Sequence, residues 1–167
     1  MAYTKLSEFL DEWEYESNST VKLLSNLTDE SLSVKVYNNG RTLGFLAWHL
    51  ATTISEMCSK AGIIFSLKEK ENEPPIFAEI IVSTYDKLSK SLIKSIKLNW
   101  TDASLNEEVE MYGEKWKRSV VLDTLVKHQI HHRGQITVLM RQAGLKVTGI
   151  YGPTKEEWQE MGLEPKK

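Results

Sequence analysis

Three of the four histidines in this chain, His128, His131 and His132, lie within five consecutive residues of a segment with helical periodicity. On a helix, His128 and His132 are four residues apart, so their side chains point about 40° from each other on one face and can reach a single ion. Two nitrogens from one helix need at least a third ligand to make a transition-metal site. His49 is the one histidine left to supply it.

The alternative is that these are ordinary helix histidines, because a neutral imidazole is satisfied by one carbonyl group and some water. Two inward histidines on an otherwise apolar face are harder to satisfy, since each buried ring needs its own partner. The spacing alone leaves both interpretations open.

The segment from His128 to His132 also overlays the zinc-protease pattern, in which two histidines bracket a glutamate. The position of the glutamate is occupied here by Gln129, whose carboxamide cannot act as the general base that activates a zinc-bound water. The peptidase chemistry is therefore lost, while the spacing of the ligands is kept. The predicted helices contain no Glu-x-x-His pair, which excludes a di-iron carboxylate site.

The elements that must position these histidines are predicted to be helices, because apolar residues recur at helical spacing between clusters of turn-forming residues. The predicted helices span about residues 5–27, from after Thr42 to near Gly62, about residues 77–98, and from Ser119 to Ala143, with a short terminal helix from Thr154 to about Met161. A polar loop is expected at residues 66–73, and a short hairpin or an extended crossover at residues 99–117. We expect an all-α, antiparallel four-helix bundle that forms one domain over residues 1–167.

The helical wheel of the last long helix separates its histidines. Taking His128 as zero, the apolar side chains centre near 60° and His132 falls near 40°, whereas His131 points about a right angle or more away from the core. His49 lies on the shoulder of the apolar face of its own helix. Gly134, in mid-helix, costs about 1 kcal/mol relative to alanine, which predicts the close approach of another helix or of a partner chain.

Three further side chains could belong to the site. Glu56 points in nearly the same direction as His49 on the helical wheel. It could be a carboxylate that supports His49 from behind, or a solvated charge on the helix surface. Gln135 could face the site or bind a carbonyl group. Arg133 points far from the inward histidines, so we expect it to brace an interface or a carboxylate.

Two aromatic residues and one thiol complete the candidates. Trp48 and Tyr112 could form the wall of a pocket, although aromatic residues in a helical bundle are usually part of the core. Cys58 lies on the wrong side of its helix relative to His49, so we expect a buried small hydrophobic residue and not a nucleophile. No pattern identifies a catalytic acid, base or nucleophile.

Composition limits the classes of partner. The chain has 167 residues, a formal net charge of −2 and a single cysteine. The nearly balanced charge and the lack of a basic run argue against nucleic acid, and no apolar run approaches the roughly 20 residues needed to span a bilayer. The single cysteine and the polar N-terminus without signal-peptide features predict a cytoplasmic protein.

The stretch from Thr42 to Leu50 (TLGFLAWHL), followed some eighty residues later by the stretch from His128 to Gln135 (HQIHHRGQ), resembles the two signature blocks of the DinB-like family, which includes the YfiT-like metal-dependent hydrolases. The resemblance covers nearly the whole chain. It implies a four-helix bundle in which His49, His128 and His132 hold a divalent ion, zinc or nickel in most members, with water in the remaining positions. It also implies a homodimer formed by packing of bundle helices.

Three neutral imidazoles leave a charge of +2 on the ion and at least one open position, which is the arrangement of a catalytic metal. Some relatives in the family resemble thiol S-transferases that use bacillithiol, mycothiol or glutathione. We therefore expect a small-molecule substrate and, most concretely, a metal-dependent S-transferase for a low-molecular-weight thiol. The alternatives are a metal-dependent hydrolase of a small substrate and a non-catalytic dimeric module produced under stress.

Overall fold

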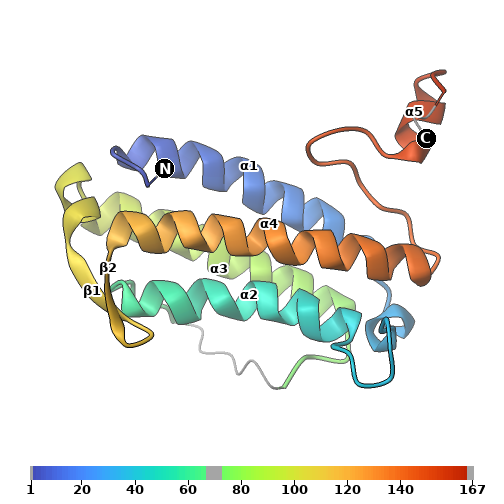
Figure 1. Ribbon diagram of the computed structural model, residues 1–167, viewed down its shortest axis with the longest axis horizontal. Helices are drawn as coiled ribbons and strands as arrows, with labels where there is room; N and C mark the ends of the chain where they lie inside the picture. Colours follow the sequence, from blue (N-terminus) through green and yellow to red (C-terminus); the bar gives the residue numbers. More distant parts are fainter. Residues whose placement is uncertain (1, 67–72, 165–167) are drawn as a thin grey trace.

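The computed structural model describes residues 2–66 and 73–164. Within these residues the chain is mostly helical, and its four long helices lie side by side (Figure 1). They are α1 (Leu6–Leu24), α2 (Leu43–Lys60), α3 (Ala78–Asn99) and α4 (Arg118–Gln142). The helix α2 packs against α3 and α4, and α1 packs against the same two helices. None of the described helices is both long enough and apolar enough to cross a bilayer.

Short elements connect and extend the long helices. The 3-10 helix η1 (Glu30–Ser33) precedes α2, and the 3-10 helix η2 (Asp102–Asn106) precedes the hairpin of β1 (Glu108–Met111) and β2 (Glu114–Lys117). The short helix α5 (Lys155–Glu160) lies apart from the four long helices, near the C-terminal end (Figure 1). Because two antiparallel strands are present, the all-α description expected from the sequence was too narrow.

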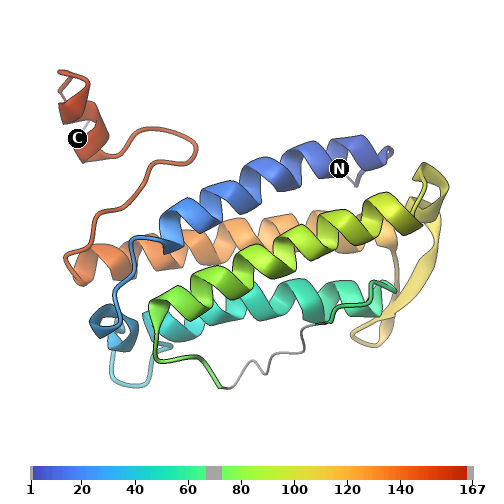
Figure 2. The same ribbon diagram turned by 180° about the vertical axis from the view of Figure 1, so that it is seen from behind.

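The relative direction of two helices also differs from expectation. An antiparallel arrangement was predicted throughout, but α2 and α3 run in the same direction (Figures 1 and 2). The long connection of residues 61–77 makes this possible. A chain of 17 residues can reach up to about 56 Å, whereas the 18 residues of α2 rise only about 27 Å, so the connection is long enough to return to the end of the bundle at which α2 began. The polar loop predicted at residues 66–73 falls mostly on residues 67–72, which lie outside the described residues.

Local signals set most of the helix ends. The side-chain oxygen of Thr42 accepts a hydrogen bond from the backbone N–H of Phe45 at 3.1 Å and so caps α2. After α2, Gly62 adopts a φ of +91°, which suits a glycine beyond a helix C-terminus. The first helix ends at Leu24 and not near residue 27. The N-terminal cap of α4 is Lys117, so the prediction of Ser119 as the cap was wrong by two residues.

The crossover before α4 adopts the hairpin of the two predicted alternatives. Tyr112 and Gly113 form its two-residue turn with φ values of 53° and 85°, and both signs match the turn that best fits the twist of paired strands. Glu108 faces Lys117 and Glu110 faces Lys115 across the strands, so opposite charges are paired. This register explains why a segment rich in charged residues forms two strands.

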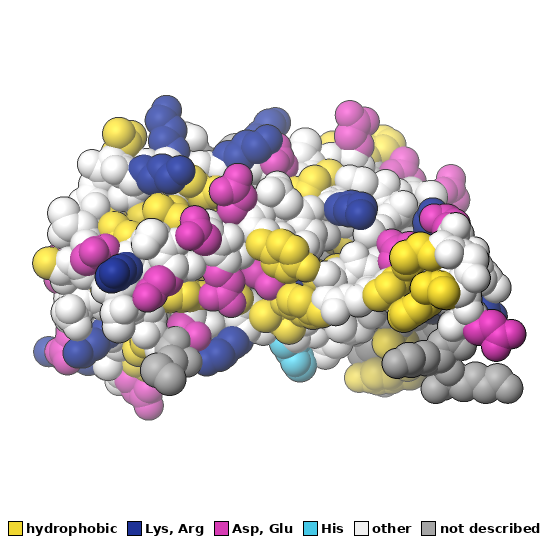
Figure 3. Space-filling model, turned by 90° about the horizontal axis from the view of Figure 1, so that it is seen from above, with side chains coloured by type: hydrophobic (Ala, Val, Ile, Leu, Met, Phe, Trp, Pro, Cys, Tyr) yellow, Lys and Arg dark blue, Asp and Glu magenta, His cyan; other side chains and the backbone are white. Residues whose placement is uncertain are grey.

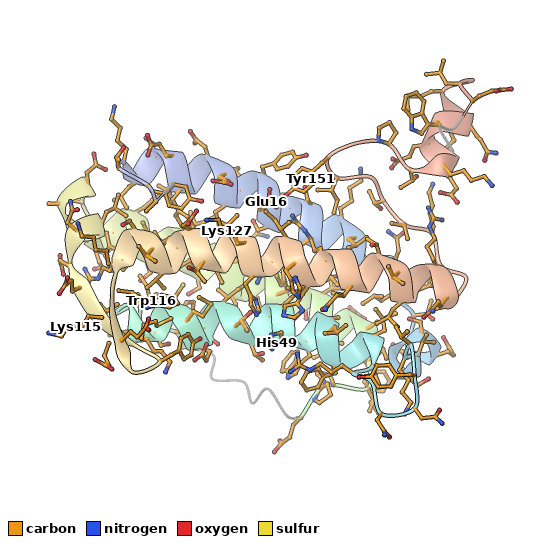
Figure 4. The ribbon with its side chains drawn as sticks, viewed as in Figure 1. Glu16, His49, Lys115, Trp116, Lys127 and Tyr151 are labelled. Carbon is orange, nitrogen blue, oxygen red and sulfur yellow. The ribbon has the colours of Figure 1, made fainter. Side chains whose placement is uncertain are left out.

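A buried ion pair joins α1 to α4 and to the C-terminal segment. The guanidinium of Arg133, 2% exposed, is paired with the carboxylate of Glu16 and also donates to the backbone oxygen of Glu16 at 2.8 Å and to the hydroxyl of Thr20 at 3.1 Å. The hydroxyl of Tyr151 donates to Glu16 at 2.6 Å and accepts from Arg133 at 2.9 Å (Figure 4). Burial and the hydrogen bond to Glu16 raise the pKa of Tyr151 to about 12, so the hydroxyl stays protonated. Arg133 therefore braces a carboxylate, as expected.

The surface carries charges of both signs. Seen from above the view of Figure 1, lysine and arginine side chains alternate with aspartate and glutamate side chains, and apolar groups lie between them (Figure 3). Exposed pairs such as Arg141 with Glu156 at 2.7 Å and Lys127 with Asp123 at 2.6 Å contribute to this mixture. Such exposed pairs stabilise a fold only weakly.

The buried ion pair predicts an asymmetric response to mutation. Replacing Arg133 by methionine should lower the free energy of unfolding by about 3–5 kcal/mol, because the carboxylate of Glu16 would stay buried without its cation. Urea denaturation at pH 7 measures the change. Combining Arg133→Met with Glu16→Leu should recover most of the loss, and Tyr151→Phe alone should cost only about 1 kcal/mol. A single Arg133→Met variant as stable as the wild type would contradict this role.

Candidate metal centre

The helices α2 and α4 bring His49, His128 and His132 together. The Nε2 atom of His128 lies 3.1 Å from Nε2 of His49 and 3.1 Å from Nε2 of His132. One ligand atom from each ring lies within 4.8 Å of the others. Figure 4 shows His49 in the stretch of α2 that runs alongside α4. The third histidine therefore reaches the pair that the helical spacing selected.

These distances suit ligands of one ion. Two nitrogens at about 2.1 Å from a common ion are about 3.0 Å apart at a ligand angle of 90° and about 3.4 Å apart at the tetrahedral angle. The two contacts of 3.1 Å fall between these values. The three imidazoles could thus hold a metal ion with little movement of their rings.

Hydrogen bonding alone accounts poorly for the cluster. A neutral ring nitrogen carries either one proton or one lone pair, so Nε2 of His128 can form a good hydrogen bond to only one of its two imidazole neighbours. The Nδ1 atom of His128 is buried and has no hydrogen-bond partner among the described residues. Ordinary buried histidines find such partners, so the interpretation of a satisfied helix histidine fits His128 poorly.

Gln135 determines which nitrogen of His132 faces the cluster. The Nδ1 atom of His132 lies 2.6 Å from the side-chain oxygen Oε1 of Gln135, which can only accept a hydrogen bond. We therefore assign the proton of the neutral ring to Nδ1, which leaves the lone pair of Nε2 directed at the other two rings. Of the two roles considered for Gln135, the structure places it at the site, in the position of a residue that orients a metal ligand.

Gln129 lies in the core and away from the cluster. It is fully buried, its Oε1 accepts a hydrogen bond from the hydroxyl of Tyr85 at 3.1 Å, and its Nε2 donates to the backbone oxygen of Leu50 at 3.0 Å. Leu50 directly follows His49, so Gln129 fixes α4 to α2 and α3 at the level of the site. The residue that replaces the glutamate of the protease pattern therefore has a positioning role and no access to a bound water.

Burial favours the uncharged forms of His128 and His132. Burial, together with the neighbouring His132 and His49, lowers the pKa of His128 to about 4. Burial also lowers the pKa of His132, against the hydrogen bond to Gln135, which raises it. At neutral pH these rings are therefore neutral, which is the state that binding of a metal requires.

Several candidates from the sequence do not join the cluster. His131 is exposed, as the helical wheel predicted, although its ring lies 4.8 Å from that of His132. Glu56 accepts a hydrogen bond from the exposed Tyr112 at 2.7 Å and pairs with Lys60, so both side chains lie at the surface. Cys58 is fully buried, and burial raises the pKa of its thiol.

Trp48 and Gly134 complete this comparison. Trp48 is only 2% exposed and belongs to the core. Apart from the backbone of its own helix, a methyl group at Gly134 would meet no atom of the described residues within 4 Å, so no other described helix approaches there. The second alternative, a partner chain, stays a prediction.

Sequence reasoning missed two residues beside the histidines. The ring of Phe45 stacks on that of His49, with 6.1 Å between centroids and an angle of 12° between planes. The guanidinium of Arg41 lies 5.1 Å from the centroid of Phe45. Phe45 precedes His49 by four residues on α2, so the helical period contained this contact, whereas Arg41 lies in an irregular connection that gives no periodic signal.

Fold and site together define a mostly helical protein with a three-histidine cluster between two of its long helices. The model of the DinB family matches residues 1–167, and the chain belongs to that family. The protein YrdA of Bacillus subtilis (strain 168) is 42% identical over 165 residues, which cover 99% of each chain.

Two solved structures are similar to this one. A DinB-like protein from Bacillus cereus ATCC 10987 has a TM-score of 0.87 and 42% identity, over 89% of this chain and 99% of that chain. The DinB-like protein YjoA of Bacillus subtilis has a TM-score of 0.69 and 18% identity, over 88% of this chain and 99% of that chain, a likeness of fold alone.

The hydrogen bond from His132 predicts an effect of Gln135 on metal affinity. Gln135→Leu should weaken binding of Zn²⁺ by about 10–100-fold, because the ring of His132 loses the partner that fixes its tautomer and orientation. Competition with a chromophoric chelator measures the affinity. Gln135→Glu, which keeps an acceptor, should bind at least as tightly as the wild type, and Gln142→Leu on the exposed surface of α4 is the matched control. Equal affinities for Gln135→Leu and the wild type would exclude this role.

The lowered pKa of His128 predicts how the metal-free protein responds to pH. The unfolded chain takes up a proton at His128 near its ordinary pKa of 6.5, whereas the folded chain does so only near 4. The unfolded state thus binds more protons in this range, and the free energy of unfolding should fall as pH is lowered from 7 to 4. Urea denaturation in the presence of a chelator should show a shallower fall for His128→Asn. Parallel profiles for the two proteins would contradict the assignment.

Proposed function

We propose that the protein is a divalent-metal-dependent enzyme whose ion is held by His49, His128 and His132 in a four-helix bundle of the DinB kind. The observation that carries the proposal is that Nε2 of His128 lies 3.1 Å from Nε2 of each of the other two rings, a distance that suits two ligands of one ion. Three neutral imidazoles provide no negative charge, and we propose zinc or nickel as the occupant.

The reaction that we propose is transfer of a low-molecular-weight thiol to an electrophile. A divalent ion with an open position supplies the means to ionise a thiol at neutral pH and so to make it a nucleophile. In the transfer, the thiol sulfur forms a bond to a carbon of the electrophile, the leaving group departs with its electron pair, and the thiol proton passes to solvent. The chain's own residues hold and orient the ligands: Gln135 at His132, and Gln129 at the backbone beside His49.

The surroundings of the cluster support a thiol over water as the nucleophile. Among the described residues, no aspartate or glutamate joins the three imidazoles as a further possible ligand. Gln129, at the position of the protease base, has both ends of its carboxamide engaged in the core. Hydrolysis by an activated water usually employs such a base, whereas a thiol is acidic enough to ionise without one.

Two alternative functions are consistent with the same three histidines. A metal-dependent hydrolase of a small substrate would use the same ligands with water as the nucleophile. A non-catalytic dimeric module would hold a structural ion or none. We propose a homodimer in either case, supported by the exposed surface of α4 around Ile130 and Gly134, where a second copy could approach the helix backbone closely.

Metal content and thiol consumption test the proposal together. Protein purified without a histidine tag and loaded with Zn²⁺ or Ni²⁺ should contain one ion per chain, and should consume bacillithiol or glutathione in the presence of 1-chloro-2,4-dinitrobenzene. His132→Ala should lose both properties, and His131→Ala, the matched control on the same helix turn, should keep both.

Three other results would contradict either the proposed reaction or the proposed metal site. One ion per chain without turnover of bacillithiol, mycothiol or glutathione would overturn the transferase. Hydrolysis of p-nitrophenyl acetate that depends on His132 would favour the hydrolase. Occupancy far below one ion per chain would favour the non-catalytic module.

A further inference from the structure

An open cavity of about 320 Å³ lies beside the histidine cluster, between α2, α4 and the irregular connection that precedes α2. Its lining residues are Val36, Tyr37, Gly40, Arg41, Leu46, Gln135, Val138 and Leu139. Leu46 and Leu139 are buried and form its inner wall, whereas Val36 and Tyr37 are 60% and 66% exposed and form its rim. The cavity is thus accessible from solvent and largely apolar inside.

The cavity and the histidine cluster share the same two helices. Leu46 precedes His49 by three residues on α2, and Gln135 follows His132 by three residues on α4, so each lies about 4.5 Å along its helix from the neighbouring histidine. Gln135 belongs to both places, since its Oε1 binds His132 while its side chain lines the cavity. A molecule in the cavity would therefore lie beside Gln135, which binds the ring of His132.

Arg41 gives the cavity its charge. It is the single charged residue among the described residues that line the cavity, and it forms no ion pair with any described carboxylate. Its guanidinium rests on Phe45, which stacks on His49, so its position is defined by contacts that lead to the cluster.

A second donor faces the same space. The Oε1 atom of Gln135 is held by His132, and its side-chain NH₂ makes no hydrogen bond to the described residues. A guanidinium and an amide N–H beside apolar walls are complementary to a carboxylate attached to an apolar group. A cationic ligand would be repelled by Arg41, and a fully polar one would leave the apolar walls poorly covered.

We propose that this cavity binds the carboxylate-bearing, partly apolar portion of a substrate, with Arg41 as its anchor. Binding of the carboxylate needs no metal, whereas its role as part of a substrate rests on the proposed function. Either the thiol or the electrophile could carry the carboxylate, so we infer the binding of a carboxylate attached to an apolar group and do not assign it to one of the two reactants.

Binding of hexanoate to the metal-free full-length chain tests the inference apart from the proposed function. Hexanoate should bind and should shift the side-chain NH₂ resonances of Gln135 in NMR spectra, and hexan-1-ol and hexylamine should bind at least tenfold more weakly. Arg41→Gln should weaken hexanoate at least tenfold without changing the binding of hexan-1-ol, and Arg41→Lys should retain most of the affinity. Val138→Glu should also weaken hexanoate, with Val138→Gln as the matched neutral control. Both positions are exposed, so these variants should keep the thermal stability of the wild type.

Equal binding of hexanoate by the wild type and Arg41→Gln, or no binding at millimolar concentrations, would overturn the inference, even if the protein proves to be a metal enzyme. Conversely, binding that depends on Arg41 would support it even if the cluster holds no ion. With the zinc-loaded enzyme, Arg41→Gln should raise KM for the one reactant that carries the carboxylate. Comparison of glutathione with its diethyl ester, and of 4-chloro-3,5-dinitrobenzoate with 1-chloro-2,4-dinitrobenzene, identifies which reactant that is.

Discussion

An imidazole nitrogen that lies 3.1 Å from two others, as Nε2 of His128 does, is costly in a protein interior unless a cation lies among the three, because it can satisfy only one neighbour by hydrogen bonding. In this protein the three rings meet where α2 packs against α4. The helix α2 supplies His49, and α4 supplies His128 and His132. The hydrogen bond from Gln129 to Leu50 fixes the two helices beside His49, and the hydrogen bond between His132 and Gln135 fixes a ring within α4. The residues around the cluster thus hold in place an arrangement that the rings alone would not favour.

Contacts on the opposite side of α4 help to hold it in this position against α2. Arg133 directly follows His132, and its pairing with Glu16 and Tyr151 ties the same turn of α4 to α1 and to the C-terminal segment. An ion pair of this kind adds little stability over apolar packing, but it strongly disfavours any rotation of α4 that would expose one charge and leave the other buried. Since the side chains of His132 and Arg133 point in different directions from α4, holding Arg133 inward toward α1 also holds His132 toward α2.

How much the sequence could predict depended on whether the relevant interaction was local. The caps and stops of α2, and the separation of His128 and His132 from His131, follow from residues within one or two helical turns, and these predictions were confirmed. The common direction of α2 and α3 depends on a connection of 17 residues that has no periodic pattern, and it was predicted wrongly. The partners of Arg133 are Glu16, 117 residues earlier on α1, and Tyr151, in an irregular segment after α4. The sequence could therefore predict that Arg133 binds a carboxylate, but not which one. Arg41 was missed for the same reason, because its position over Phe45 is a property of a loop.

We propose that the three Nε2 atoms are ligands of one ion. The most direct test is a crystal structure of the untagged protein grown with Zn²⁺, with anomalous diffraction recorded on both sides of the zinc absorption edge. We expect one anomalous peak per chain, about 2.1 Å from Nε2 of His49, His128 and His132, with Nδ1 of His132 still bound to Gln135. Three rings in the same positions with no peak among them, or an ion held by other side chains, would contradict it.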